Sequence, residues 1–129
     1  MGESALGVLL QWLRNQRGLS LRELAQLSDV DHAYIYRLET GDKESPSVDV
    51  ISKLLRALKA GRRESDMVRY LADHAATDPE LVRNAVADKT VTYEVFAMVA
   101  GAAHRGAKPD YPKLIARARM LLEDDDGPR

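Results

Sequence analysis

The chain has 129 residues, with 19 lysines and arginines against 20 aspartates and glutamates, a net charge of −1, and no cysteine. That length allows one domain, or one small domain with an appendage, and the absence of cysteine excludes disulfides and cysteine-ligated metals. No segment approaches the roughly 18 uninterrupted apolar residues of a membrane span, so we expect a soluble, cytoplasmic protein.

Apolar residues recur at helical spacing along the whole chain, and no alternating strand pattern is present, so we predict an all-α fold. The first helix is expected from Ser4 to Arg17, with Gly18 as its stop. The second begins after Ser20, which forms a capping box with Glu23 because each side chain can satisfy a free amide of the other.

Asp31 is expected to cap the third helix, which ends at Gly41. Ser47 is expected to cap the fourth, which ends before Gly61. The residues of the fourth helix that we expect to face inward are Val48, Ile51, Leu54, Leu55 and Leu58. Two short helices joined by a tight turn, the second with polar side chains outside, form the geometry that places a helix in the DNA major groove.

The run LRNQRGLSLRELAQLSDVDHAYIYRLETG, followed by PSVDVISKLLRAL, resembles the helix-turn-helix family of phage repressors of the Cro and C1 type, also called the XRE family. The resemblance covers Leu6 to Leu58 and implies a DNA-binding transcriptional regulator. At the turn, where the family usually carries glycine, this chain has Asp29, which tolerates left-handed geometry. The loop with Asp42 and Glu44 is a second departure, because many members are basic there.

The third helix divides into two faces. Its core face is predicted from helical spacing to comprise Val30, Ile35 and Leu38. On the outer face, the resemblance implies base-edge contacts from His32, Ala33 and Arg37. Arg37 suits a bidentate contact to guanine, and the Ala33 methyl suits a thymine methyl. For His32 the alternative is a solvated surface histidine.

Other residues are implied to set register on the DNA rather than to read sequence. The resemblance brings the Arg22 side chain close to a phosphate, and Tyr36 and Thr40 are placed for phosphate or sugar contacts. Lys43 is a further expected DNA-binding residue. Tyr34, in contrast, is interpreted as packing on the core, since buried aromatic residues dominate small cores.

Structural support for the third helix is implied as well. The resemblance pairs Arg14 with Glu39, which ties the first helix to the end of the third, and places Gln26 behind the third helix. Residues 1–60 hold eight lysines and arginines and eight aspartates and glutamates, a net charge of zero. Since DNA affinity depends largely on phosphate neutralisation, we expect a single copy to bind weakly and two copies to share one duplex.

We divide the chain into a helix-turn-helix domain at 1–61, a helical dimerisation and regulatory domain at 62–123, and an acidic tail at 124–129. Helices in the second domain are expected from Glu64 to Ala75, from Pro79 after the cap Asp78, from Tyr93 to His104, and after Asp110. The last helix carries an apolar stripe of Tyr111, Leu114, Ile115, Ala118, Leu121 and Leu122. The tail from Glu123 is expected to be disordered.

This stripe predicts a homodimer whose interface takes its distal part, with Leu121 and Leu122, and which reads an inverted repeat with half-sites about one helical turn apart. The run HRGAKPDYPKLIARARMLL resembles the C-terminal ends of some bacterial stress-response repressors, which implies dimerisation and a partner metallopeptidase. The alternative is that these helices complete one monomeric core.

Enzyme chemistry is not expected. Asp73 and His74 with Asp78 are typical of a solvated helix end rather than a metal site, and no phosphate loop or nucleophile motif is present. We therefore predict a nucleoid-associated homodimeric repressor with no metal and no cofactor. The alternative is an antitoxin or adaptor that works mainly through a protein partner, which the neutral charge favours.

Overall fold

The computed structural model describes residues 2–43, 45–102 and 108–126, with side chains up to residue 123. Within these residues the secondary structure is entirely helical, which confirms the predicted all-α fold. The helices are α1 (Ala5–Gln16), α2 (Leu21–Ser28), α3 (His32–Thr40), α4 (Val48–Leu58), α5 (Arg62–Asp73), α6 (Pro79–Val86), α7 (Tyr93–Gly101) and α8 (Tyr111–Asp126). In this part of the chain, no helix has the length and apolar character needed to cross a membrane.

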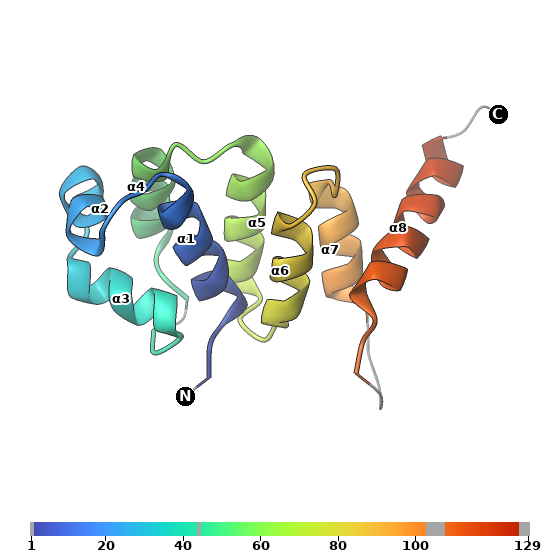
Figure 1. The fold of residues 1–129 in the computed structure, drawn as a ribbon, viewed down its shortest axis with the longest axis horizontal. Helices are drawn as coiled ribbons and strands as arrows, with labels where there is room; N and C mark the ends of the chain where they lie inside the picture. Colours follow the sequence, from blue (N-terminus) through green and yellow to red (C-terminus); the bar gives the residue numbers. More distant parts are fainter. Residues whose placement is uncertain (1, 44, 103–107, 127–129) are drawn as a thin grey trace.

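The helices are arranged along one long axis. Figure 1 shows α2, α3 and α4 at one end, α8 at the other, and α1, α5, α6 and α7 between them. α1 packs on α3, α5 and α6, while α8 packs on α7 and α6. A single cluster of buried apolar residues extends from α1 to α8. The division at residue 61 thus remains a prediction, and the two parts share one core.

Local hydrogen bonds explain where the helices begin. The Ser20 hydroxyl accepts from the Glu23 amide at 3.1 Å while the Glu23 carboxylate accepts from the Ser20 amide at 2.8 Å, so the predicted capping box is confirmed. The hydrogen bond from the Ser20 amide, together with the Ser20 side chain, lowers the pKa of the Glu23 carboxyl. Asp31 and Ser47 cap α3 and α4 as predicted, and Asp110 accepts from the Lys113 amide at the start of α8.

Several predicted boundaries and faces are wrong. Val48 was expected to face inward but is 82% exposed, because it opens α4 before the buried stripe begins at Ile51. α5 begins at Arg62 and ends at Asp73, which leaves Ala75 exposed beyond the helix. α7 ends at Gly101, and His104 lies outside the described residues.

The expected disorder of the tail is also wrong in its first part. α8 continues to Asp126, so the backbone of residues 123–126 is helical. The chain has no glycine or proline between the apolar stripe and Gly127, and no local signal therefore ends the helix earlier. Residues 127–129 lie outside the described part of the chain.

Candidate nucleic-acid interface

The turn between α2 and α3 places the two helices at a fixed angle. Asp29 lies in the left-handed region, at φ 59° and ψ 34°, and its amide donates to the carbonyl of Ala25 at 2.9 Å. The buried Ser28 hydroxyl accepts from the amide of Val30 at 3.2 Å. The expectation that aspartate can take the place of the family's glycine here is confirmed.

The inner face of α3 lies very close to α1. Ile35 and Leu38 are fully buried, as the helical spacing predicted. A Cβ atom at Gly7 of α1 would lie 2.5 Å from the carbonyl oxygens of both Leu38 and Glu39. Because real Cβ atoms do not come so near to a carbonyl oxygen, only glycine allows this approach. The backbone of α1 therefore sets the position of the C-terminal end of α3.

A buried ion pair fixes the same end of α3. The Arg14 guanidinium contacts the Glu39 carboxylate through Nε to Oε2 at 2.7 Å and through Nη2 to Oε1 at 3.0 Å. Its Nη1 donates to the Leu19 carbonyl at 2.8 Å, and the two charged side chains are only 13% and 3% exposed. The hydrogen bond to Glu39 raises the pKa of Arg14. The pair that the resemblance implied is thus present, and its fork geometry ties α1, the following loop and α3 together.

The outer face of α3 is polar and open to solvent. Ala33, Tyr36 and Arg37 are exposed, and His32 is half-buried, with Nδ1 lying 4.0 Å from an Asp31 carboxylate oxygen. The Thr40 hydroxyl donates to the carbonyl of Arg37 at 3.4 Å and so turns toward its own helix.

The two cations that flank the outer face of α3 are both exposed. Arg22 is exposed on α2, and Lys43 is exposed just after α3, where its amide donates to the Arg37 carbonyl at 3.0 Å. Gln26 is exposed on α2, and its expected support of α3 remains a prediction.

Tyr34 has a role that the sequence reasoning missed. Its ring is half-buried against the core, as expected, but two cations also approach it. The Arg37 guanidinium carbon lies 6.0 Å from the ring centroid, and Lys43 Nζ lies 5.9 Å from it. Both distances suit a cation–π interaction. Tyr34 therefore gathers Arg37 and Lys43 at one place on the outer surface. The sequence offered one sign of the contact with Arg37, because residues three apart on a helix lie next to each other.

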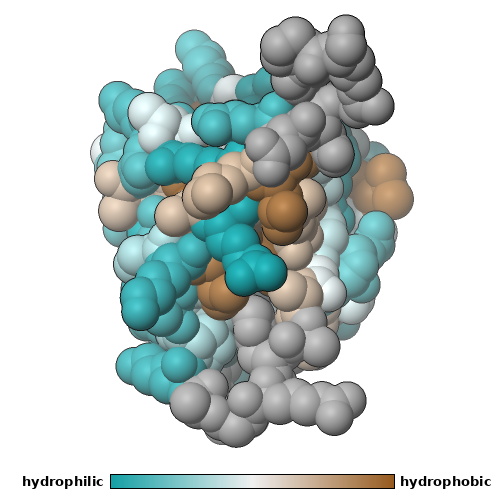
Figure 2. Space-filling view, turned by 90° about the vertical axis from the view of Figure 1, so that its right-hand side faces the viewer, coloured by the Kyte–Doolittle hydropathy of each residue, from teal (hydrophilic) through white to brown (hydrophobic). Residues whose placement is uncertain are grey.

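The apolar stripe of α8 divides into a buried and an open part. Tyr111, Ile115 and Ala118 are buried against the rest of the chain, and Leu114 and Leu122 are half-buried. Leu121 is 48% exposed, and its neighbour Met120 is 65% exposed. The space-filling view of this end of the molecule shows brown apolar surface beside teal polar side chains (Figure 2). The first part of the stripe completes the monomer core, while the distal part remains accessible.

Two of the three residues considered for a metal, His74 and Asp78, have other partners. The His74 ring stacks on Tyr70 with centroids 3.9 Å apart, and its Nδ1 lies 2.8 Å from the Tyr70 carbonyl oxygen. Asp78 accepts from the Glu80 amide at 3.0 Å and from the Tyr111 hydroxyl at 2.8 Å. These contacts assign His74 to a helix end and Asp78 to a helix cap.

The α2–turn–α3 arrangement, with a core face, a left-handed turn and a polar outer face, is that of a helix-turn-helix. Residues 5–67 match the family model of a helix-turn-helix domain. The chain is also 31% identical over 103 residues to RghRB of Bacillus subtilis (strain 168), an uncharacterized HTH-type transcriptional regulator, covering 78% of this chain and 72% of RghRB. The chain therefore belongs to the XRE-type family of helix-turn-helix regulators.

Proposed function

We propose that this protein is a sequence-specific DNA-binding transcriptional regulator that inserts α3 into the major groove. The observation that carries the proposal is the outer face of α3, where Arg37 is exposed on a helix whose inner face is fixed by Gly7 and the Glu39 ion pair. A guanidinium held in a constant position can make a bidentate contact to the O6 and N7 atoms of guanine. Family membership supports this reading.

The remaining outer residues fit a division between base and backbone contacts. His32 and Ala33 lie at the start of α3, the part of a recognition helix that meets base edges. Arg22, Tyr36 and Lys43 flank them and are assigned to phosphate or sugar, which sets register on the duplex. Tyr34 contributes indirectly, since its ring lies beside both Arg37 and Lys43.

We also propose that the active form is a homodimer that represses by occupying an inverted repeat at the nucleoid. The first 60 residues carry no net charge, so one copy neutralises few phosphates and a second copy adds the missing contacts. α3 and α8 lie at opposite ends of the longest axis (Figure 1), so a dimer formed through α8 separates its two α3 helices widely. We therefore propose half-sites more than one helical turn apart, in place of the single turn expected from the sequence.

A salt titration of binding to random duplex DNA tests the proposal. A DNA regulator loses affinity steeply with salt, with a logarithmic slope of roughly −0.9 for each phosphate it neutralises. The variant Arg22→Ala should reduce that slope by about one. Binding that is absent, or insensitive to salt, would instead favour the antitoxin or adaptor role, for which the neutral charge of the first half is the supporting observation. Immunoprecipitation of bound DNA with sequencing identifies the operator.

A further inference from the structure

The outermost helix, α8, is held in place by two polar tethers as well as by its buried residues. At its start, the Tyr111 hydroxyl donates to Asp78 Oδ2 at 2.8 Å. In its second half, Arg119 Nη2 donates to the Thr90 hydroxyl at 2.7 Å and to Asp88 Oδ2 at 3.3 Å. Hydrogen bonds from Thr90 lower the pKa of Asp88, so this carboxylate keeps its charge beside Arg119. The two tethers set the angle of α8 on α6 and α7.

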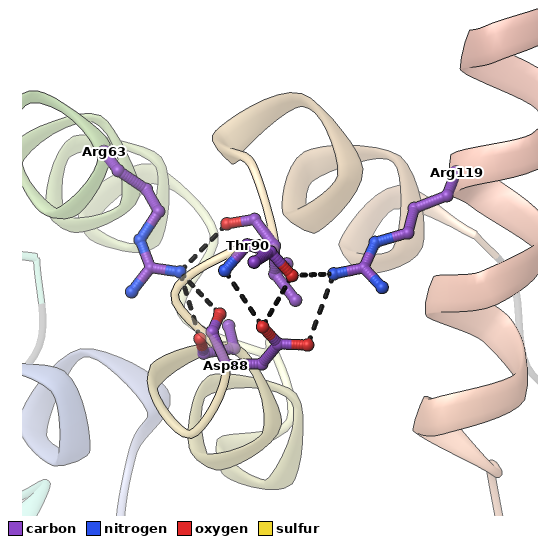
Figure 3. Close-up of polar contacts among 6 residues, drawn as sticks. Arg63, Asp88, Thr90 and Arg119 are labelled. Atoms are coloured by element: carbon purple, nitrogen blue, oxygen red, sulfur yellow. Dashed lines mark hydrogen bonds and ion pairs between the residues drawn. The ribbon is translucent and has the colours of Figure 1, made fainter.

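The loop that receives Arg119 is itself fixed from the other side. Figure 3 shows Arg63 reaching this loop from α5 and Arg119 reaching it from α8. Arg63 Nη1 donates to three carbonyl oxygens, those of Ala85 at 3.0 Å, Asp88 at 3.1 Å and Val91 at 2.9 Å. These carbonyls lie at and after the end of α6. Two of them also accept backbone hydrogen bonds, Ala85 from the Asp88 amide at 3.3 Å and Asp88 from the Val91 amide at 3.1 Å, so Arg63 adds a side-chain contact to a loop that is already hydrogen-bonded. The loop that holds α8 is therefore fixed by α5, and this fixes the direction in which the outward face of α8 points.

That outward face combines exposed apolar residues with an uneven distribution of charge. Met120 and Leu121 are exposed near its middle. Lys113 and Arg117 are exposed in the first half of the helix, whereas Glu123 is exposed in the second half and is followed in sequence by three aspartates. Arg117 precedes Met120 by three residues, and Glu123 follows it by three. Figure 2, which views this end of the molecule, shows polar and apolar surface side by side.

We propose that two copies of the chain pair through the outward faces of α8 in antiparallel orientation, with Met120 next to the twofold axis. A twofold contact uses the same surface on both copies, so Met120 and Leu121 cover their counterparts. In the antiparallel orientation, Arg117 of each copy lies opposite the acidic second half of the partner helix. A parallel orientation would place cation against cation and acid against acid, which disfavours pairing. The inference rests on the homodimer of the proposed function, but does not require DNA.

The exposed methionine gives the first test. Sedimentation equilibrium on the full chain should show a dimer for the native protein, and Met120→Asp should raise the dimer dissociation constant by more than about tenfold, because it places two carboxylates at an apolar axis. The matched control is Val48→Asp, which changes an apolar residue that is even more exposed than Met120, on α4 at the opposite end of the molecule, and should leave the dimer intact. A monomeric native protein, or equal effects of the two substitutions, would overturn the proposal.

Charge exchange tests the orientation. In the antiparallel arrangement, Arg117→Glu and Glu123→Lys should each weaken the dimer by about tenfold, and the double variant should restore it, since each charge again faces its opposite. In a parallel arrangement Arg117 would face its own copy, so Arg117→Glu alone would leave the dimer unchanged. That outcome, or a double variant no better than the single ones, would overturn the proposal. Arg117 and Glu123 are both exposed, so helical content by circular dichroism should remain native.

The same variants separate this inference from the proposed function. A protein that dimerises as described but binds no DNA would refute the regulator role alone. A native protein that binds its operator as a monomer would refute the α8 pairing and the proposed homodimer, and would leave the DNA-binding regulator role standing. Measuring self-association without DNA, and operator binding by fluorescence anisotropy, distinguishes the two failures.

Discussion

α3 and α8 lie at opposite ends of the molecule (Figure 1), yet they are held and exposed in contrasting ways. α3 is fixed by a buried ion pair and by backbone contact with Gly7, and it exposes polar side chains. α8 is attached by one buried edge and two polar tethers, and it exposes Met120 and Leu121. Base readout requires donors at constant positions, whereas apolar surface stabilises an assembly only when another surface covers it. The contrast associates α3 with nucleic acid and α8 with protein.

Removing the Arg14–Glu39 ion pair should have the largest effect, because this pair holds α3 in place. Arg14→Met or Glu39→Gln should each lower the free energy of unfolding by about 3 kcal/mol, because each leaves a buried partner unpaired. The double variant should cost less than the sum of the single variants. Urea denaturation gives all three values.

The exposed pair between Lys53 and Asp49, 3.2 Å apart on α4, is the control for this cycle. Its coupling should be no more than about 0.5 kcal/mol, as for other exposed pairs one helical turn apart. If Arg14 and Glu39 give additive losses, the buried pair does not fix α3.

Gly7→Ala should loosen α3 without changing any charge. The added methyl would clash with the backbone of Leu38 and Glu39, so we expect a loss of about 1–3 kcal/mol in the free energy of unfolding. Gly101→Ala is the matched control, since a Cβ atom there meets no atom of the described residues within 4 Å. Equal stabilities of the two variants would show that α1 and α3 can separate at little cost.

Arg37→Ala should change the exposed face of α3 without changing the contacts that hold the helix. We expect specific binding to weaken by about 1–3 kcal/mol and the preference at one base position to relax, as for a lost bidentate contact. Arg69→Ala, which removes an exposed arginine from α5, serves as the control. Selection of bound sequences from a random pool measures the preference. A variant that retains the full operator preference would exclude Arg37 as a base reader.

Tyr111→Phe should give the smallest effect, a loss of about 1 kcal/mol, by removing the first tether of α8. Burial, followed by the hydrogen bond to Asp78, raises the pKa of Tyr111 to about 12. An unfolded tyrosine ionises near pH 10, so this contribution is complete below about pH 10 and is lost as the pH rises toward 12.

Urea denaturation at neutral pH and near pH 11 should therefore show a smaller alkaline loss of stability for Tyr111→Phe than for the native protein. Tyr36→Phe, at a tyrosine that is 54% exposed, should match the native protein in stability. If Tyr111→Phe also matches it, the hydroxyl does not help to hold α8.

The sequence by itself determined the features that depend on neighbouring residues. Capping hydrogen bonds close within two or three positions, so Ser20, Asp31 and Ser47 marked true helix starts. Asp29 likewise took the left-handed turn position that its short polar side chain permits. The core face of α3 followed from helical spacing alone, because its inward residues recur with the period of the helix.

Only the tertiary structure decided which apolar residues are covered and which distant groups meet. An apolar stripe shows which side of a helix faces the core. How much of that stripe a neighbouring helix covers depends on residues remote in sequence. Ala118 is therefore the last fully buried residue of the stripe on α8, Leu122 is half-buried, and Leu121 is left open. The placing of Lys43 against Tyr34 and of Arg63 against the carbonyl oxygens after α6 depends likewise on chain paths that no local spacing specifies.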